Sequence, residues 1–152
     1  RAWKSLAPDL RRVAVLTGPG LQGLIQESRS AASAYQIDLL HVPVRSDKET
    51  LFAYKRIASQ AQGLWLVPDN RVLSSETIRE LLAHSVREGK QVSAPNPELL
   101  AFGALLSASS DYGDIAERVV ARARQSWGRS ELPGPAIEPL QRAQINVNAR
   151  ML

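Results

Sequence analysis

Residues 11–35 read "RRVAVLTGPGLQGLIQESRSAASAY", and this stretch decides the fold. Its first part, "VAVLT" at residues 13–17, is a short continuous apolar run, which is typical of a strand buried on both faces of a parallel sheet. Apolar side chains at three- and four-residue spacing then predict a helix over residues 21–35. The stretch therefore predicts a strand, a glycine-rich loop and a helix in succession.

The same unit recurs along the chain. Further apolar runs predict strands at residues 39–44, 63–68 and, more weakly, 91–94. Helical spacing predicts helices over residues 47–60, 75–88 and 112–127. Right-handed crossovers between parallel strands convert this alternation into an α/β fold: a three-layer, doubly wound, mostly parallel sheet.

Some element ends carry their own signals. Ser46 followed three residues later by Glu49 is a capping-box pattern, which marks the start of a helix. Gly89 stands where a helix C-terminal cap is expected. Near the end of the chain Ile145 and Val147 alternate with polar residues, which predicts a short edge strand.

We expect one α/β domain over residues 1–152. It comprises an N-terminal lead-in at 1–10, a βα core at 11–127, and a proline-rich arm with the closing strand at 128–152. Three prolines impose extended backbone on the arm: Pro133, Pro135 and Pro139.

Composition excludes several kinds of site. The 152 residues include no cysteine, which excludes disulfides, thiolate catalysis and cysteine-based metal sites. The two histidines, His41 and His84, lie far apart in the expected fold, so we expect no metal site.

The net charge is +4, with an arginine cluster near the C-terminal end: Arg118, Arg122, Arg124 and Arg129. No recognition motif accompanies it, so we interpret it as a solvated helix face and expect no nucleic-acid partner.

The loop "GPGLQG" has the glycine spacing of a dinucleotide-binding fingerprint and lies between a strand and a helix. Pro19 removes an amide that a phosphate would use, and no acid ends the second strand, where Arg45 stands instead. Because an arginine there suits a 2′-phosphate, an NADP-dependent oxidoreductase stays open as an alternative. The other interpretation is a tight turn with close helix packing.

Ligands of such a sheet bind beyond the carboxyl ends of its strands. There Asp69 and Asn70 follow a buried strand and precede a helix, so their side chains can reach a polar ligand. The structural alternative is an Asx turn at this pair, with Ser74 or Ser75 capping the helix. No nucleophile elbow or acid–base pair is evident in these loops, so we expect no enzyme.

The order of the motifs resembles the second half of the ABC-transporter substrate-binding protein family that includes tryptophan and tyrosine binders, with the type I periplasmic-binding-protein fold. "RRVAVLTGPG" resembles the strand and loop that open its C-terminal lobe, and "GLWLVPDNRVLSS" its strand with an Asp-Asn pair. "GKQVSAPNPELLAFGALLSASSDYGDIAERVVARA" resembles its next strand, a Gly-Ala-Leu segment and the Asp-Tyr before a long helix, and "AQINVNARML" its closing strand.

The resemblance implies a single lobe of that fold whose loops face a small polar ligand such as an amino acid. It places seven residues toward the ligand: Thr17, Gly18, Pro19, Gly20, Asp69, Asn70 and Asn96. It also implies a periplasmic or lipid-anchored protein that acts with a membrane transporter or another envelope protein, without catalysis, cofactor or metal.

Members of that family have two lobes and close to twice this length, and hinge closure traps the ligand between the lobes. In a single lobe, the long helix and the closing strand must fold back onto the sheet or exchange with a second copy, so we predict a homodimer. The leading hypothesis is a solute-binding-like component of an envelope transport system, reduced to one lobe, that senses a ligand or acts through protein interaction. A ligand-free structural adaptor is a further alternative.

Overall fold

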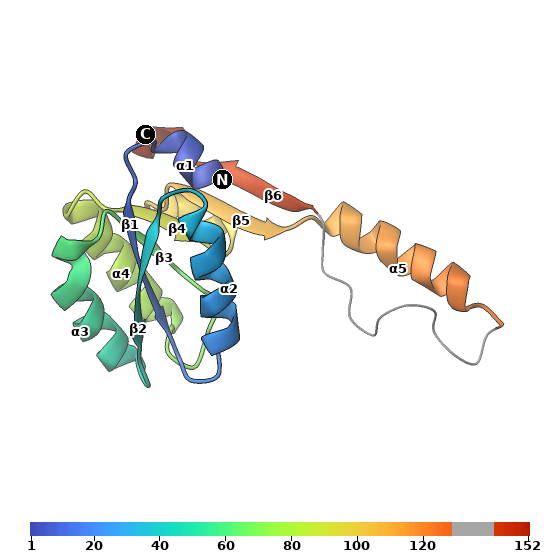
Figure 1. Ribbon diagram of the computed structural model, residues 1–152, viewed down its shortest axis with the longest axis horizontal. Coiled ribbons are helices and arrows are strands. Elements are labelled where there is room, and N and C mark those ends of the chain that lie inside the picture. Colours follow the sequence, from blue (N-terminus) through green and yellow to red (C-terminus); the bar gives the residue numbers. More distant parts are fainter. Residues whose placement is uncertain (129–141) are drawn as a thin grey trace.

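The computed structural model describes residues 1–128 and 142–152, so the expected prolines of the arm, Pro133, Pro135 and Pro139, lie outside the described residues. Within these ranges one six-stranded sheet has the order β2-β1-β3-β4-β5-β6 (Figure 1). Its strands are β1 (Arg12–Thr17), β2 (Asp38–Pro43), β3 (Gly63–Trp65), β4 (Gln91–Ala94), β5 (Leu106–Ser110) and β6 (Ala143–Val147). The first five run parallel and β6 pairs antiparallel with β5, which confirms the mostly parallel sheet expected from the sequence.

Helices connect these strands. They are α1 (Ala2–Leu6), α2 (Gln22–Ser33), α3 (Asp47–Ile57), α4 (Ser75–Arg87) and α5 (Tyr112–Ser126), with 3₁₀ turns η1 (Ala58–Gln60), η2 (Pro97–Phe102) and η3 (Ala149–Met151). Helices α1 and α2 contribute to one hydrophobic core and α3 and α4 to the other, so the sheet is the middle of three layers.

Strand β1 supplies side chains to both cores. Val13 and Val15 pack with Ile25 of α2, and the alternate residues Ala14 and Leu16 pack with α3 and α4. All four β1 residues are buried. The run "VAVLT" is therefore continuously apolar because both faces of the strand are buried, as the sequence predicts. Successive side chains of a strand point to opposite faces, so burial of both faces requires apolar residues at every position.

The predicted helix ends agree with the structure. The Ser46 hydroxyl oxygen accepts a hydrogen bond from the Glu49 N–H at 3.3 Å, and the Glu49 carboxylate accepts one from the Arg45 N–H at 2.8 Å. Gly89 follows α4 with a φ of 62°, the left-handed conformation of a C-terminal glycine. The helical spacing also predicts Val86 on the inward side with Leu82, but Val86 is 42% exposed because Leu82 and Ser85 form the buried face of the last turns.

Two other expectations need correction. Strand β3 ends at Trp65 and not at residue 68. The helical spacing also predicts Leu24, Ile25 and Tyr35 on one buried stripe, but only Ile25 is buried, Leu24 and Tyr35 are each 40% exposed, and α2 ends at Ser33 before Tyr35. Strand β5 was not predicted from the sequence. Its residues, "LSASS", are mostly small and polar and form no apolar run, yet Ser107 of β5 is fully buried.

The closing strand and the long helix behave differently. Strand β6 folds back onto the sheet, where Val147 is paired with Leu106 and Ala143 with Ser110. Helix α5 extends away from the body of the molecule (Figure 1). Val119 and Val120, which the helical spacing places together on one apolar side, are exposed. Strand β6 therefore follows the first of the two expected alternatives, folding back onto the sheet, whereas α5 does not.

A close backbone approach at Gly63 holds α1 against the sheet. A Cβ atom at this position would lie 2.5 Å from the Trp3 ring and 3.1 Å from the Gln91 carbonyl oxygen. Trp3 also donates from its indole nitrogen to the Gln91 side chain at 2.8 Å. We predict that Gly63→Ala lowers the free energy of unfolding by about 1–3 kcal/mol, the usual cost of overpacking, as measured by urea denaturation.

The matched control is Gly23→Ala in α2, where an added Cβ meets nothing within 4 Å. Because alanine is the better helix former, this variant should gain about 0.5–1 kcal/mol. Equal stability of the two variants would contradict the proposed close packing at Gly63.

Candidate functional site

The carboxyl ends of the parallel strands carry the candidate site. The chain leaves β1 toward β2 on one side, and β3 lies on the other side of β1, so the strand order reverses between β1 and β3. The loops that follow β1 and β3 meet at this reversal, which is where open α/β sheets bind ligands. A cavity lies on either side of this meeting point.

The smaller cavity, which we call the Thr17 cavity, has a volume of about 480 Å³. It is lined by Thr17, Gly18, Pro19, Gln22, His41, Pro43, Val44, Arg45 and Glu49. The Thr17 hydroxyl is buried and lies 2.8 Å from Nε2 of His41. Burial first, and the nearby Arg29 second, lower the pKa of His41, which favours the neutral ring.

Asp69 ties together the loops at the strand-order reversal. Its side chain is almost fully buried, and it accepts hydrogen bonds from the Gly18 N–H at 2.9 Å and from the Arg71 guanidinium at 2.7 and 2.9 Å. It also accepts from the Arg71 N–H at 3.3 Å, the Asx turn that was the structural alternative. The other part of that alternative holds too, because the Ser74 hydroxyl caps α4 by accepting from the Thr77 N–H.

The electrostatics of this contact are clear. Hydrogen bonds from the Arg71 side chain, and then from the Gly18 N–H, hold the pKa of Asp69 below its usual range against the opposing effect of burial. A Cβ atom at Gly18 would lie 2.8 Å from the Asp69 Oδ2 atom. Glycine at this position therefore lets the carboxylate approach the backbone.

The same contact bears on the dinucleotide alternative. The Gly18 N–H is already bound to a carboxylate, and Pro19 has no N–H to offer. The carboxylate also places negative charge where a pyrophosphate would have to lie. The geometry around "GPGLQG" therefore favours the tight-turn interpretation over a pyrophosphate cradle.

The other predicted residues are spread along the edge. Gly20 and Asn70 are exposed and line neither cavity, and Asn96 lines the larger one. The structure thus brings Thr17, Gly18 and Asp69 together and leaves Asn96 apart from them. Whether any of the seven contacts a ligand stays a prediction.

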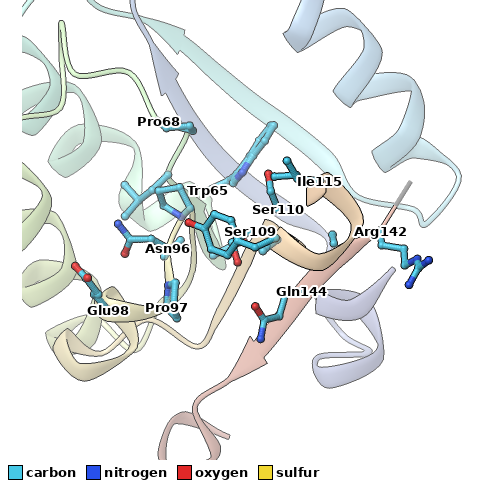
Figure 2. A pocket seen from close by; sticks show the side chains of 17 residues that line it. Trp65, Pro68, Asn96, Pro97, Glu98, Ser109, Ser110, Ile115, Arg142 and Gln144 are labelled. Atoms are coloured by element: carbon cyan, nitrogen blue, oxygen red, sulfur yellow. The ribbon is translucent and has the colours of Figure 1, made fainter. Parts of the chain in front are cut away.

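The larger cavity, which we call the main cavity, has a volume of about 840 Å³ (Figure 2). It is lined by Trp65, Leu66, Pro68, Ser93, Ala94, Pro95, Asn96, Pro97, Glu98, Ala108, Ser109, Ser110, Tyr112, Ile115, Arg142, Ala143 and Gln144. Trp65 is paired with Ser93, and Ser93 with Leu106, so these side chains share one face of the sheet. This face lies on the side of α2, at strands that α5 leaves uncovered.

The main cavity combines aromatic walls with dispersed polar groups. Trp65 and Tyr112 supply apolar surface, and Asn96, Ser109 and Ser110 supply donors and acceptors. This is the usual construction of a small-molecule site, in which a few polar groups orient a ligand against apolar walls. Arg142, at the rim, forms ion pairs with Asp114 at 3.6 Å and Glu117 at 3.3 Å.

Several residues of the site were missed by sequence reasoning. The sequence pattern predicts Trp65 only as part of a buried strand, and Ser109 and Ser110 belong to strand β5, which it does not predict. His41 was placed inside an apolar strand, yet its ring reaches the Thr17 cavity. A polar or aromatic residue at the carboxyl end of a parallel strand can indicate a ligand-facing side chain. Trp65, which ends β3, carries this indication in the sequence.

Among residues 1–128 and 142–152 no helix is both long and apolar enough to span a membrane. The same ranges contain no cluster of three or more histidine or acidic side chains arranged to hold a metal ion.

Similar solved structures were found by comparison of the fold. A conserved domain protein from Vibrio cholerae superposes with a TM-score of 0.74 at 17% identity, over 99% of this chain and 51% of its own. An ABC domain in complex with L-Trp from Streptococcus pneumonia gives 0.73 at 14% identity, over 97% and 52%. A substrate-binding protein with adhesive properties from Clostridium difficile gives 0.63 at 15% identity, over 97% and 50%.

No family model matches the chain, and no curated protein matches its sequence. The chain spans about half the length of the similar structures. At these identities the likeness shows the fold. It confirms the resemblance to ABC-transporter substrate-binding proteins at that level, and the fold as a single lobe of the periplasmic-binding-protein type.

The Asp69 contact predicts how stability depends on pH. Because the folded-state pKa of Asp69 lies below its unfolded value of about 3.9, its stabilisation is complete above that value and is lost as the pH falls through the folded pKa. We predict that Asp69→Asn lowers the free energy of unfolding at neutral pH by about 1–3 kcal/mol. The difference from the wild type should shrink below pH about 4.

The control is Asp38→Asn, which removes a pair with Arg12 at 3.8 Å in which both side chains are more than half exposed. Exposed ion pairs contribute little, so this variant should unfold like the wild type. If the difference in free energy of unfolding between Asp69→Asn and the wild type did not change with pH, the assigned ion pair would be contradicted.

Proposed function

We propose that this chain is a non-enzymatic, solute-binding lobe of an ABC-type envelope transport system, which binds a small polar ligand such as an amino acid. The observation that carries the proposal is the main cavity, which opens at the carboxyl ends of β3, β4 and β5. It has the location and the mixed aromatic and polar lining of a small-molecule site.

The chemistry of the lining suits an amino acid. An ammonium group requires acceptors, which the Glu98 carboxylate and the Asn96 carbonyl supply, and a carboxylate requires donors, which Ser109 and Ser110 supply. A side chain of the ligand would lie against Trp65. A similar structure, the ABC domain from Streptococcus pneumonia, holds L-Trp, which supports a ligand of this class.

The residues first singled out divide into two groups under this proposal. Asn96 contacts the ligand in the main cavity, and Thr17, Gly18 and Pro19 line the separate Thr17 cavity, which could hold a second small polar group. Gly20 and Asn70 are exposed on the same edge, outside both cavities. Asp69 acts by positioning the Gly18 loop.

The proposal includes the setting and the partners. Substrate-binding proteins among the similar structures support a periplasmic location and a membrane transporter or another envelope protein as partner, with the lobe acting by ligand sensing or by protein interaction. A homodimer belongs to the same proposal. The proposal also assigns the lobe a binding role without catalysis.

Binding is tested by thermal unfolding of the chain with each amino acid and, separately, with NADP. We predict that at least one amino acid raises the melting temperature, because a ligand that binds only the folded state stabilises it. Ala108→Trp, which fills the main cavity from the exposed middle of β5, should abolish that shift.

The matched control is Gln26→Trp, which adds the same side chain to an exposed position of α2 and should keep the shift. Stabilisation by NADP would favour the oxidoreductase alternative, and no shift with any ligand would favour the structural adaptor. Either result would overturn the proposal.

A further inference from the structure

The Thr17 cavity is separate from the main cavity and shares no lining residue with it. Its walls come from one continuous stretch, residues 17–49, which includes the end of β1, the start of α2, the end of β2 and the start of α3. At about 480 Å³ it lies within the usual range for small-molecule sites. The groups that line it are set by contacts within this stretch and do not depend on what covers the outer surface of the molecule.

A hydrogen-bonded pair forms one wall of this cavity. Thr17 is 1% exposed, and its hydroxyl lies 2.8 Å from Nε2 of His41. A buried hydroxyl hydrogen needs an acceptor, and among the described residues Nε2 is the atom that the Thr17 hydroxyl contacts. The hydroxyl therefore donates to Nε2, which assigns the ring proton to Nδ1. No group of residues 1–128 and 142–152 bonds to Nδ1, so its N–H is available to a ligand.

Two further donors line the same cavity. Within the described part of the chain, the Arg45 guanidinium forms no hydrogen bond or ion pair, and the Gln22 carboxamide forms no hydrogen bond. The guanidinium carries five N–H donors and a permanent positive charge. Gln22 stands in the first turn of α2, which has no acidic residue and no side-chain cap. The cavity is therefore rich in donors that have no protein acceptor.

The charges around the cavity favour a negative ligand. Arg45 lines it, and Arg29 of α2 lies near enough to His41 to contribute to the lowering of its pKa. Glu49 is the acid in the lining, and its carboxylate already accepts a hydrogen bond from the Arg45 N–H at 2.8 Å. Asp69 lines neither cavity and is already paired with an arginine, so its charge does not oppose an anion there.

We propose that the Thr17 cavity binds the carboxylate of a small organic solute, with Nδ1 of His41, the Arg45 guanidinium and the Gln22 carboxamide as its donors. Thr17 is a positioning residue, because its bond to Nε2 orients the ring and holds the proton on Nδ1. A carboxylate bound in this way needs no amide of the glycine-rich loop. The site goes beyond the solute site of the proposed function and does not rest on it.

The rest of the lining indicates what the carboxylate is attached to. Pro19, Pro43 and Val44 supply apolar surface beside the donors. A carboxylate group alone would fill only part of the cavity, so the remaining volume suits a short apolar body. The chemical class that fits is therefore a short-chain monocarboxylate, for which butyrate is the probe.

The test is an NMR titration of the two histidine rings with sodium butyrate at constant ionic strength. We expect the His41 signals to shift along a saturating curve. The pKa of His41 should rise when butyrate is bound, because a neighbouring anion favours the charged ring. His84, which packs edge-on against Tyr54 in another part of the fold, is the internal control and should not respond.

Variants test the assigned donors. Arg45→Gln should weaken butyrate binding by about tenfold or more, since a hydrogen bond to a charged group is lost. Its matched control is Arg56→Gln, which removes the same charge from an exposed position in the last turn of α3 and should bind like the wild type. Both arginines are exposed, so both variants should keep the wild-type melting temperature. Thr17→Val should also weaken binding, and Thr17→Ser should retain it.

Three further probes separate the chemistry of the ligand. Acetate should bind roughly tenfold more weakly than butyrate, because it lacks two methylene groups that the cavity would bury. Butylamine has an apolar body of the same length with a positive charge, and it should not bind. Inorganic phosphate supplies the negative charge without the apolar body, and it should bind more weakly than butyrate.

Equal shifts at both histidines would indicate a general effect of salt and would overturn the proposal. Binding of butylamine, or an unchanged affinity of Arg45→Gln for butyrate, would also overturn it. Tighter binding of phosphate than of butyrate would overturn the assignment to an organic carboxylate. Ala108→Trp, which fills the main cavity, should leave butyrate binding intact, so failure of this site is distinguishable from failure of the proposed solute site.

Discussion

Val13 and Val15 of β1 pack on the side of α2, and Ala14 and Leu16 of the same strand pack against α3 and α4. The rest of the molecule depends on this double burial, because it places β1 between β2 and β3 with a helical layer on either side. With β1 in this position, the chain leaves β1 to form β2 on one side and returns to form β3 on the other side of β1. The loops that follow β1 and β3 are thereby forced together at the carboxyl edge.

Because these loops meet, Asp69 forms a structural contact between them, so an aspartate at this position does not by itself indicate a ligand-binding side chain. Its carboxylate satisfies the Gly18 N–H and the Arg71 guanidinium and is almost fully buried. A ligand that bound this carboxylate directly would have to displace a short ion pair. Other polar groups line the Thr17 cavity and the main cavity, where a ligand could reach them without displacing this ion pair.

The sequence predicted the parts of the fold that have strong local signals. The apolar run of β1, the Ser46–Glu49 capping box and Gly89 at the end of α4 each specify local structure through contacts within a few residues. Strand β5 escaped prediction because its stability comes from two neighbouring strands, and small polar side chains such as Ser107 are buried there by tertiary packing. The site was predicted only as an edge of the sheet, since the distance between Trp65 and Ser109 in space depends on how several strands align.

Strand β6 returns antiparallel along β5, and its last residue, Val147, is paired with Leu106 at the start of that strand. The final residues therefore lie at the amino-terminal end of the sheet, where α1 also enters β1 and where Figure 1 shows the two ends of the chain close together. Both ends thus point away from the two cavities. A surface tether, a fused reporter or a neighbouring module joined at either end would leave the carboxyl edge open to diffusing solutes, so the lobe can be immobilised from either terminus with the same face presented.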